Sequence, residues 1–500
     1  MILLLSIALP IILIFYILHK TKPQTVTTLP PGPPPLPLIG NFHQLGKAAE
    51  PHIYLHQLSK KYGPIIHMKL ASRPLLVISS AKLAKQVLKI QDLAFCSRPN
   101  YLGQQKLSYN SSDVAFTPYN EDWKEIRKMT HIHLFSSKRI QSYRPVREQE
   151  ISRMITGISS SASGEVNLNE VVMSTGIHIL CGITFGKRLY SEEWSDTKRF
   201  LQFLKGFDVL ATSFFVSDYF PMFGLVDWIS GKLKRAESIF KGMDSFYHER
   251  IDEHLESRRV KEVKEVEDMV AVLMKLKNDD ESSSSGITLK NIKALLMNMI
   301  VASAETTPAA VVWTMTALIK APKVLEKLKN EIRSLVGEKG QVDEDDLPKL
   351  PYLKAVINEG LRLYPPVPLL IPRESIETSN LDGYEIPPKT LVYVNAYAVG
   401  RDPECWENPD EFFPERFLNS GIDYKGQDFG LIPFGSGRRM CPGMSMGYLT
   451  TELMVANLVY GFDWELPKGV LAQDVDTDAT KGLAVFKKNP LLLVPKTIRV

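Results

Sequence analysis

The stretch Phe434-Gly435-Ser436-Gly437-Arg438-Arg439-Met440-Cys441-Pro442-Gly443 determines how the rest of the chain is interpreted. Its single cysteine lies between glycines, which let a backbone turn tightly and approach a flat ligand closely. Pro442 favours a helix start directly after the cysteine, and the sequence predicts a helix over 444–460 with Cys441 at its entrance. The positive end of that helix, with two neighbouring arginines, favours a thiolate over a thiol.

A lone cysteine beside a glycine-rich turn is usually an inert buried residue. Here the ten residues contain the whole pattern Phe-x-x-Gly-x-Arg-x-Cys-x-Gly, and the stretch resembles the haem-thiolate signature of the cytochrome P-450 superfamily. The resemblance implies that Cys441 is the axial ligand of a haem b iron. It also implies that Phe434 packs beside the thiolate and that Arg439 neutralises a haem propionate. The fold that it implies is the mainly α cytochrome P-450 fold with small β-sheets.

The composition favours one large globular domain and excludes a nucleic-acid-binding chain. The 500 residues carry a net charge of +4 with both signs mixed and no dense Lys/Arg stripe. The four cysteines have no paired or metal-finger spacing, which indicates a reducing compartment. Short strands are expected at 65–68 and 75–78, helices at 81–89 and 121–129, and a long polar loop at 101–119.

The N-terminus predicts a membrane anchor. Residues 1–18 are almost entirely apolar, near the lower limit for crossing about 30 Å of hydrocarbon. A cleaved signal peptide carries positive charge before its apolar core, whereas here the basic residues follow it. This order favours an uncleaved single-pass anchor with a cytosolic body. Residues 19–40 form a basic, Pro-rich linker before a catalytic domain over 41–500, and the Pro-Pro-Gly-Pro hinge resembles that of microsomal family members, which implies the endoplasmic reticulum membrane.

The longest predicted helix, 288–320, contains an acid next to a hydroxyl residue, Glu305 and Thr306. A buried acid in an apolar helix is costly unless it is used or paired. In the family an acid–threonine pair at this place delivers protons during oxygen activation, which implies that both residues are catalytic. Ser303 stands where the family has glycine. Pro308 has no N–H for the carbonyl of residue 304, which predicts that the helix breaks or kinks there.

Two further motifs occur in the order that the family has. Trp123 and Arg127, four apart on one helix face, match a Trp-x-x-x-Arg that holds a haem propionate; without the resemblance they would be a surface cation–aromatic pair. Glu359 and Arg362, together with Arg416 of Pro-Glu-Arg-Phe, match a buried structural triad beneath the haem. Removing one member of such a triad costs about 3–5 kcal/mol.

The resemblance also implies where substrate binds. The predicted pocket is largely apolar and is lined by Ala302, Val367, Leu369, Leu370 and Leu483. Arg373 occupies a place where a family arginine often meets a haem propionate. The Phe-rich segment 200–223 corresponds to the roof of the pocket in the family, where it touches the membrane.

The reaction implied is insertion of one oxygen atom from O2 into a small, largely apolar organic substrate. Electrons would come from NADPH through a membrane-bound reductase, docking near Lys124, Lys128 and Arg438. The motifs look most like plant microsomal enzymes of specialised (secondary) metabolism. Segments 215–231 and 368–374 resemble a subgroup that oxidises amino-acid-derived aldoximes, and an aromatic substrate is the other option.

Two alternatives stay open at this point. One is a P-450-type enzyme that rearranges or dehydrates its substrate without O2, against which Glu305 and Thr306 argue. The other is a membrane-anchored haem sensor or carrier without enzymatic activity, which needs neither a proton-delivery pair nor a reductase surface. NADPH oxidation in the presence of reductase separates the enzyme from the sensor.

Overall fold

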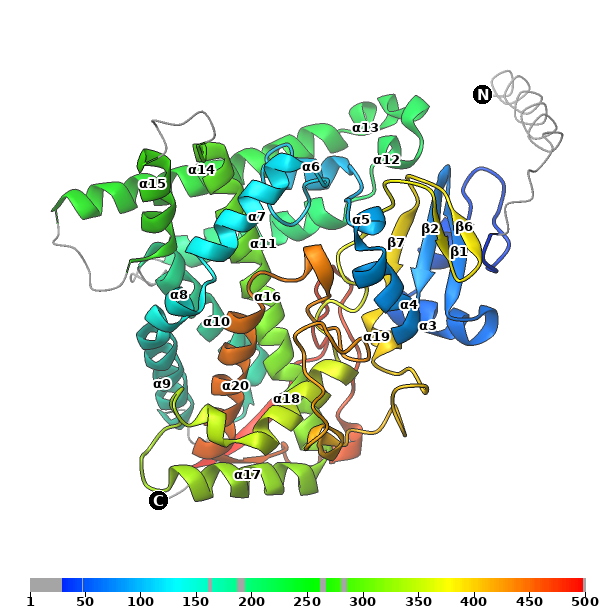
Figure 1. Cartoon of the computed structure of the whole chain (residues 1–500). Helices are drawn as coiled ribbons and strands as arrows, with labels where there is room; N and C mark the ends of the chain where they lie inside the picture. Colours follow the sequence, from blue (N-terminus) through cyan, green and yellow to red (C-terminus); the bar gives the residue numbers. More distant parts are fainter. Residues whose placement is uncertain are drawn as a thin grey trace.

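The computed structural model describes residues 29–46, 48–160, 164–186, 194–260, 267–279 and 286–497. The predicted anchor at 1–18 and the first part of the linker lie outside the described residues. Within the described ranges, helices form the larger part of the body and a small sheet region lies at one side of it (Figure 1). The mainly α fold with small sheets is therefore confirmed.

The first group of helices runs from the N-terminal side to the centre. It comprises α2 (Phe42–Leu45), α3 (Pro51–Tyr62), α4 (Ala81–Lys85), the π-helix η1 (Gln86–Ile90), α5 (Asp92–Phe95), α6 (Leu102–Leu107), α7 (Glu121–His133), α8 (Ser137–Ser142), α9 (Arg144–Ser160) and α10 (Leu168–Phe185). The helices predicted at 81–89 and 121–129 are both present, although the first widens into a π-turn. The loop predicted at 101–119 is wrong in part, because α6 forms inside it.

The later helices form the roof and the C-terminal half. They are α11 (Trp194–Thr212), α12 (Val216–Tyr219), η2 (Pro221–Phe223), α13 (Leu225–Ile229), α14 (Lys232–Val260), α15 (Met269–Asp279), α16 (Leu289–Lys320), α17 (Pro322–Val336), η4 (Leu347–Lys349), α18 (Pro351–Leu363), α19 (Ala396–Val399), η5 (Pro414–Phe417), η6 (Gly437–Arg439), α20 (Met444–Gly461) and η7 (Ala472–Asp474). We call α11, α12, η2 and α13 the roof segment.

The strands form three small sheets. The largest has the order β1 (Ile65–Leu70), β2 (Arg73–Ile78), β7 (Leu391–Val394) and β4 (Arg373–Glu374), in which only β2 and β7 are parallel. The second has the order β3 (Val166–Asn167), β9 (Leu492–Thr497) and β8 (Phe462–Glu465), and the third pairs β5 (Ser379–Leu381) with β6 (Tyr384–Ile386). The strands predicted at 65–68 and 75–78 are confirmed, and their pairing with β7 joins segments that lie far apart in sequence.

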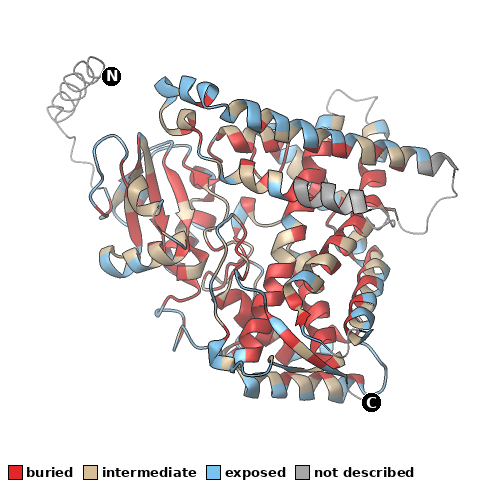
Figure 2. Ribbon diagram, turned by 180° about the vertical axis from the view of Figure 1, so that it is seen from behind, coloured by how far each residue is buried: buried red, intermediate tan, exposed pale blue. Residues whose placement is uncertain are grey.

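Helix α16 passes through the middle of the body, with α10 and α20 packed along it (Figure 1). Its start is fixed by a capping box: the Thr288 hydroxyl accepts the Asn291 N–H (3.2 Å), and the Asn291 side chain accepts the Thr288 N–H (3.1 Å). A helix that is apolar on most of its faces must be enclosed by others, and the centre of the body is indeed buried (Figure 2). This central helix therefore fixes the frame of the site.

The break predicted in α16 is wrong, because the helix continues through Ala304 and Pro308. A proline removes one hydrogen bond of the helix ladder, but the bonds of the neighbouring residues remain. Pro308 is also buried against Gly176 of α10, where an added Cβ would lie 2.9 Å from the proline ring. Close packing of the two helices thus holds the backbone on its helical path.

The Pro-rich segment packs on the sheet region from its first described residues. The His67 N–H of β1 donates to the carbonyl of Pro31 (3.0 Å), and an added Cβ on Gly32 would lie 1.8 Å from the His67 carbonyl oxygen. The Asn41 amide donates to the carbonyl of Pro33 (3.1 Å). The domain boundary predicted at residue 41 therefore falls inside a packed segment.

Apolar side chains are exposed together on the roof segment. They are Met222, Phe223, Leu225, Val226, Trp228 and Ile229, with Met222 93% exposed. In Figure 2 much of the ribbon at this end of the molecule is pale blue, the colour of exposed residues. Among the described residues, two helices are long and apolar enough to cross a membrane, α10 and α16. The bent helix pair Phe203–Tyr219 and Pro221–Ile229 would be long enough if it formed one span. However, α10 and α16 are largely buried inside the body, and the exposed apolar surface lies on the roof segment.

Candidate active site

Cys441 lies in the loop between η6 and α20. Its N–H donates to the carbonyl of Phe434 (3.0 Å), which closes the loop. Gly437 has φ +72°, and an added Cβ there would lie 2.0 Å from the carbonyl oxygen of Leu88. Only glycine can therefore bring the loop this close to η1. The helix predicted over 444–460 is confirmed, since α20 begins at Met444.

The electrostatic setting of the cysteine differs from the expectation. Burial raises the pKa of the Cys441 thiol, and the N–H of Gly443 and the guanidinium of Arg127 oppose this effect only in part. Pro442 also lies before the helix and not at its first position. The N–H of Gly443 and the charge of Arg127 thus act in the predicted direction, toward the thiolate, but burial has the larger effect on the pKa of the thiol. A coordinated metal cation deprotonates a thiol outright, so the thiolate depends on the metal.

A cavity separates the cysteine loop from α16. Cys441, Phe434 and Gly443 line it from the loop, and Ala302, Ser303 and Thr306 line it from the helix. The Thr306 hydroxyl donates to the carbonyl of Ala302 one turn earlier (2.6 Å). A cysteine thiol and a threonine hydroxyl group thus share one cavity, although they come from segments far apart in the chain.

Arginines surround the part of this cavity next to the loop. Arg98, Arg127, Arg373 and Arg439 all line it. Arg98 donates to the carbonyls of residues 371 and 372 (2.6 and 2.8 Å), and Arg439 donates to the carbonyls of residues 96 and 117 (2.7 and 2.8 Å). Arg373 reaches the Asp92 carboxylate (3.2 Å) and the Ser436 carbonyl (3.1 Å), and Arg127 bonds the carbonyl of residue 440.

This arginine cluster carries more positive charge than the acids beside it. Burial, followed by repulsion from Arg439 and Arg373, holds the pKa of Arg98 well below its usual range. The pKa of Arg439 falls to about 9, mainly through burial, and repulsion from Arg373 contributes. A ligand with two carboxylates would relieve this repulsion. The cluster and the cysteine across the cavity therefore fit a haem, whose two propionates are such carboxylates.

Trp123 supports the cluster from behind and does not line the cavity. Its ring lies 3.8 Å from the guanidinium carbon of Arg439, and its indole N–H donates to the carbonyl of Val114 (3.0 Å). The helix that carries it starts at Asn120, whose side chain accepts the Trp123 N–H (2.8 Å). Of the two residues predicted to hold a propionate, Trp123 and Arg127, only Arg127 lines the cavity.

Glu305 does not line the cavity that its neighbour Thr306 lines. Its side chain is hydrogen bonded to Asp208 of the roof helix α11. Burial first, and then the negative charge and hydrogen bond of Asp208, raise the pKa of Glu305 to about 8. An acid–acid contact of this kind was not predicted from the sequence.

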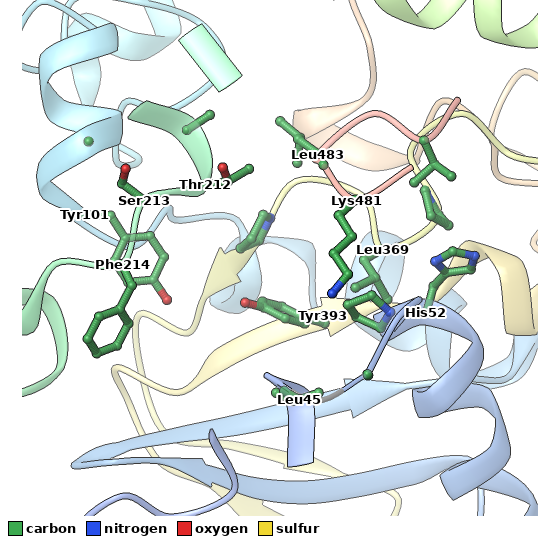
Figure 3. Close-up of a pocket in the computed structure, with 18 of the residues that line it drawn as sticks. Leu45, His52, Tyr101, Thr212, Ser213, Phe214, Leu369, Tyr393, Lys481 and Leu483 are labelled. Carbon is green, nitrogen blue, oxygen red and sulfur yellow. The ribbon is translucent and has the colours of Figure 1, made fainter. Parts of the chain in front are cut away.

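The predicted pocket residues divide between two cavities. Ala302, Val367 and Leu370 line the cavity that contains Cys441, whereas Leu369 and Leu483 line a second cavity of about 410 Å³. Leu370 lines both. Figure 3 shows the second cavity, where the side chains of Leu369, Tyr393 and Lys481 lie together between the sheet region and the end of α11. The two cavities thus adjoin at Leu370.

The structure brings the three members of the predicted triad together. Arg362 donates to both carboxylate oxygens of Glu359 (2.7 and 2.8 Å), and Arg416 donates to one of them (3.1 Å). The side chains of Glu359 and Arg362 are fully buried. Arg362 also donates to the carbonyls of residues 400, 409 and 411. Both guanidinium groups thus share one carboxylate, and backbone carbonyls accept their further N–H groups, as buried charges require.

The three basic residues predicted to dock a reductase lie near the loop surface or on α7. Lys124 is exposed and pairs with Glu121 (2.6 Å), and Lys128 is exposed on the same helix. Arg438 is half-exposed and pairs with the buried Asp92 (3.0 Å), which Arg373 also contacts. Asp92 therefore links the surface arginine to the arginine cluster.

A family model described as cytochrome P450 matches residues 30–494, almost the entire described chain. The chain belongs to the cytochrome P450 family. Its cofactor is therefore a haem whose iron takes a cysteine thiolate, and its electrons come from a reductase. The P450 is an enzyme that inserts one oxygen atom from O2 into a small organic molecule.

Curated relatives place this P450 among plant enzymes of specialised metabolism. The 6,7,8-trihydroxycoumarin synthase of Pastinaca sativa is 46% identical over 501 residues, 98% of each chain. The 5-OH-xanthotoxin synthase of Ammi majus is 46% identical over 505 residues, 99% of this chain and 98% of its own. A zebra fish cytochrome P450 structure with abiraterone superposes with a TM-score of 0.76 at 24% identity, over 91% of this chain and all of that one, and shares the fold.

Two residues at the site escaped the sequence reasoning. Arg98 belongs to no periodic pattern, and only its neighbour Pro99 marks the position. Asn298 lies on α16, where its amide donates to Asp113 (2.8 Å) and its oxygen accepts the N–H groups of Val114 and Ala115 (3.1 and 3.2 Å). It ties the loop after α6 to the cavity wall. No local signal in the sequence reveals such a long-range contact.

Proposed function

We propose that this P450 hydroxylates a flat, oxygen-bearing aromatic molecule of the coumarin class. The observation that carries this proposal is the cavity between Cys441 and α16, whose walls include the apolar side chains of Ala302, Val367 and Leu370. Such walls suit an apolar ring and exclude water from the reacting atoms. The printed names of the relatives, a trihydroxycoumarin synthase and a 5-OH-xanthotoxin synthase, support ring hydroxylation as the reaction.

The residues around the cavity would share the work as follows. Cys441 would hold the haem iron, with Phe434 packed beside it, and a haem with a thiolate ligand would supply the oxygen-activating chemistry. The cationic side chains of the arginine cluster, Arg98 included, would hold the propionates, and Trp123 would position Arg439 by stacking. Thr306 would pass protons into the cavity, and Glu305 would supply them.

We further propose that the enzyme is anchored in the endoplasmic reticulum membrane by residues 1–18, in a single pass. The basic residues that follow this apolar segment support a cytosolic body. The exposed apolar side chains of the roof segment, such as Trp228 (69% exposed), would then insert into the same membrane. The second cavity ends near this surface, at Phe214 and Ser213 (Figure 3), which suits an apolar substrate that arrives from the lipid.

Reductase docking is proposed at the surface around Lys124, Lys128 and Arg438. Exposed cations attract an acidic electron donor over distances of about 10 Å at moderate salt. Arg438 lies two residues after Ser436 and three before the cysteine, so a donor bound there would approach the haem from the thiolate side. Charge reversal at these positions should slow reduction at low salt and leave the substrate-binding spectra unchanged.

The first test is spectroscopic. The reduced enzyme in membranes should give a strongly red-shifted Soret band with carbon monoxide, and Cys441→Ala should lose it. Coumarin, hydroxycoumarins and xanthotoxin are then screened for binding spectra and, with NADPH and reductase, for products carrying one oxygen atom from labelled O2. Rearranged or dehydrated products without label would favour an O2-independent enzyme. NADPH consumption that no compound stimulates, with no product, would favour a haem sensor and contradict the proposal.

A further inference from the structure

Two carboxyl groups, one on α16 and one on the roof helix α11, meet between these helices. The side chains of Glu305 and Asp208 are hydrogen bonded to one another. Two ionised carboxylates have no donor between them, so this contact requires that the pair holds one proton. The pair lies next to Thr306, whose hydroxyl lines the cavity. A shared proton is thus stored one residue away from the reaction space.

The packing of α11 holds Asp208 in this position. Phe207 and Leu210, on either side of it in the sequence, are 4% and 1% exposed. The ring of Phe207 lies 6.4 Å from that of Phe116, and the Thr212 hydroxyl donates to the Asp208 carbonyl (2.6 Å). Asp208 itself is half-buried, so its carboxylate borders both Glu305 and solvent.

Other charged groups on the packed helices face different partners. On α16 itself Lys293 binds Asp244 of α14 (2.8 Å). On α10 His178 faces Glu150 of α9 (3.7 Å), and on α18 Glu359 faces the two arginines of the triad. Lys205, one turn before Asp208 on α11, is exposed. Among the described residues, Asp208 is the charged group that acts on Glu305.

We propose that Asp208 is a positioning residue that holds the Glu305 carboxyl group through a shared proton, so that Glu305 can give that proton toward Thr306. The proton that Glu305 loses is replaced from solvent by way of the Asp208 carboxylate. The proposal rests on the monooxygenase function proposed above, because that reaction consumes protons. It also makes proton supply depend on α11 being seated on α16.

The direction of the pH effect follows from the contact. The hydrogen bond from Glu305 lowers the pKa of Asp208 against the larger effect of burial, whereas Asp208 raises the pKa of Glu305. The contact with Asp208 therefore keeps a proton on Glu305 to higher pH than an ordinary carboxyl group would hold it. Without the negative charge of Asp208, Glu305 should lose its proton at lower pH.

The test combines two readouts on the full-length holoenzyme in membranes. Infrared difference spectra between acid and alkaline pH follow the C=O stretch of a protonated carboxyl group, assigned to Glu305 by its absence in Glu305→Gln. In Asp208→Asn the midpoint of this band should fall by about one pH unit or more. With a coumarin substrate and reductase, hydrogen peroxide release should rise relative to product at a correspondingly lower pH.

Three controls make the result decisive. Lys205→Gln changes a charge on the same helix and should keep the midpoint of the unmodified enzyme. Asp208→Glu restores a carboxylate and should move the midpoint back, and the carbon monoxide spectrum checks that each variant folds. An unchanged midpoint in folded Asp208→Asn would overturn the proposal. If unmodified enzyme makes no product at any pH while the infrared band still shifts in Asp208→Asn, the assigned reaction fails and the carboxyl pair stands.

Discussion

Glu359 of α18 and Glu305 of α16 are both enclosed by packed helices, but their partners carry opposite charge. Glu359 is bound by Arg362 and Arg416 through three hydrogen bonds of 2.7 to 3.1 Å. Glu305 faces another acid, Asp208, and must keep a proton to do so. A glutamate side chain therefore supports the fold at position 359 and holds a proton at position 305. The charge of the partner, cationic in the first case and acidic in the second, determines which of the two it does.

Breaking the compensated group should have the largest effect. Glu359→Ala leaves Arg362 and Arg416 buried without their carboxylate, and we expect a loss of about 3–5 kcal/mol in the free energy of unfolding. Denaturant unfolding of purified holoenzyme and the yield of the red-shifted carbon monoxide complex measure it. A loss below about 1 kcal/mol would show that the group is less dehydrated than its fully buried side chains indicate.

The arginine cluster is a third case. Its like charges repel one another, and the propionates of the haem would supply the negative charge that neutralises them. Arg373→Gln removes one buried cation from it, and we expect haem to be held about 2 kcal/mol less tightly, the typical value of a hydrogen bond to a charged group. Haem transfer to an excess of an apo-globin acceptor measures the loss. Arg438→Gln, in the same loop but half-exposed, is the control and should hold haem nearly as well as the unmodified enzyme.

Neutralising the uncompensated acid should have the opposite sign from breaking the triad. In the folded protein the pKa of Glu305 is raised to about 8, whereas in the unfolded chain the carboxyl group loses its proton near the ordinary pKa of 4.5. Its contribution to stability is therefore complete below pH 4.5 and lost as pH rises toward 8. Glu305→Gln does not titrate, so from pH 6.5 to pH 8 it should gain about 1–2 kcal/mol relative to the unmodified enzyme. A gain that is equal at both pH values would contradict the raised pKa.

An exposed ion pair should have the smallest effect on the free energy of unfolding. Lys82 and Asp382 lie 3.6 Å apart with side chains 70% and 45% exposed. Water screens such a pair, and Lys82→Gln should change the free energy of unfolding by less than about 0.5 kcal/mol. Unfolding curves that overlay those of the unmodified enzyme are the expected result. A larger change would mean that this pair, and not burial, contributes to the stability of the sheet region.

Features that depend on neighbours along the chain could be predicted from the sequence. The cysteine loop needs the positive φ of Gly437 and a helix after Gly443, and both of these are local features of the backbone. Glu359 and Arg362 are three apart on one helix, and their pairing follows from helical geometry. The mainly α fold and the haem-thiolate class followed from such patterns, whereas the proposed break at Ala304 failed because packing against α10 was not visible in the sequence.

The sequence by itself therefore determined the class of the enzyme, through the resemblance of its motifs to the family, and the pairing of Glu359 with Arg362, through their helical spacing. The tertiary structure decided which charges meet: Arg98 with Arg439, and Asp208 with Glu305. It also divided the predicted pocket into two cavities that adjoin at Leu370. These contacts join segments far apart in the chain, and their electrostatic consequences depend on burial and distance, which no local pattern contains.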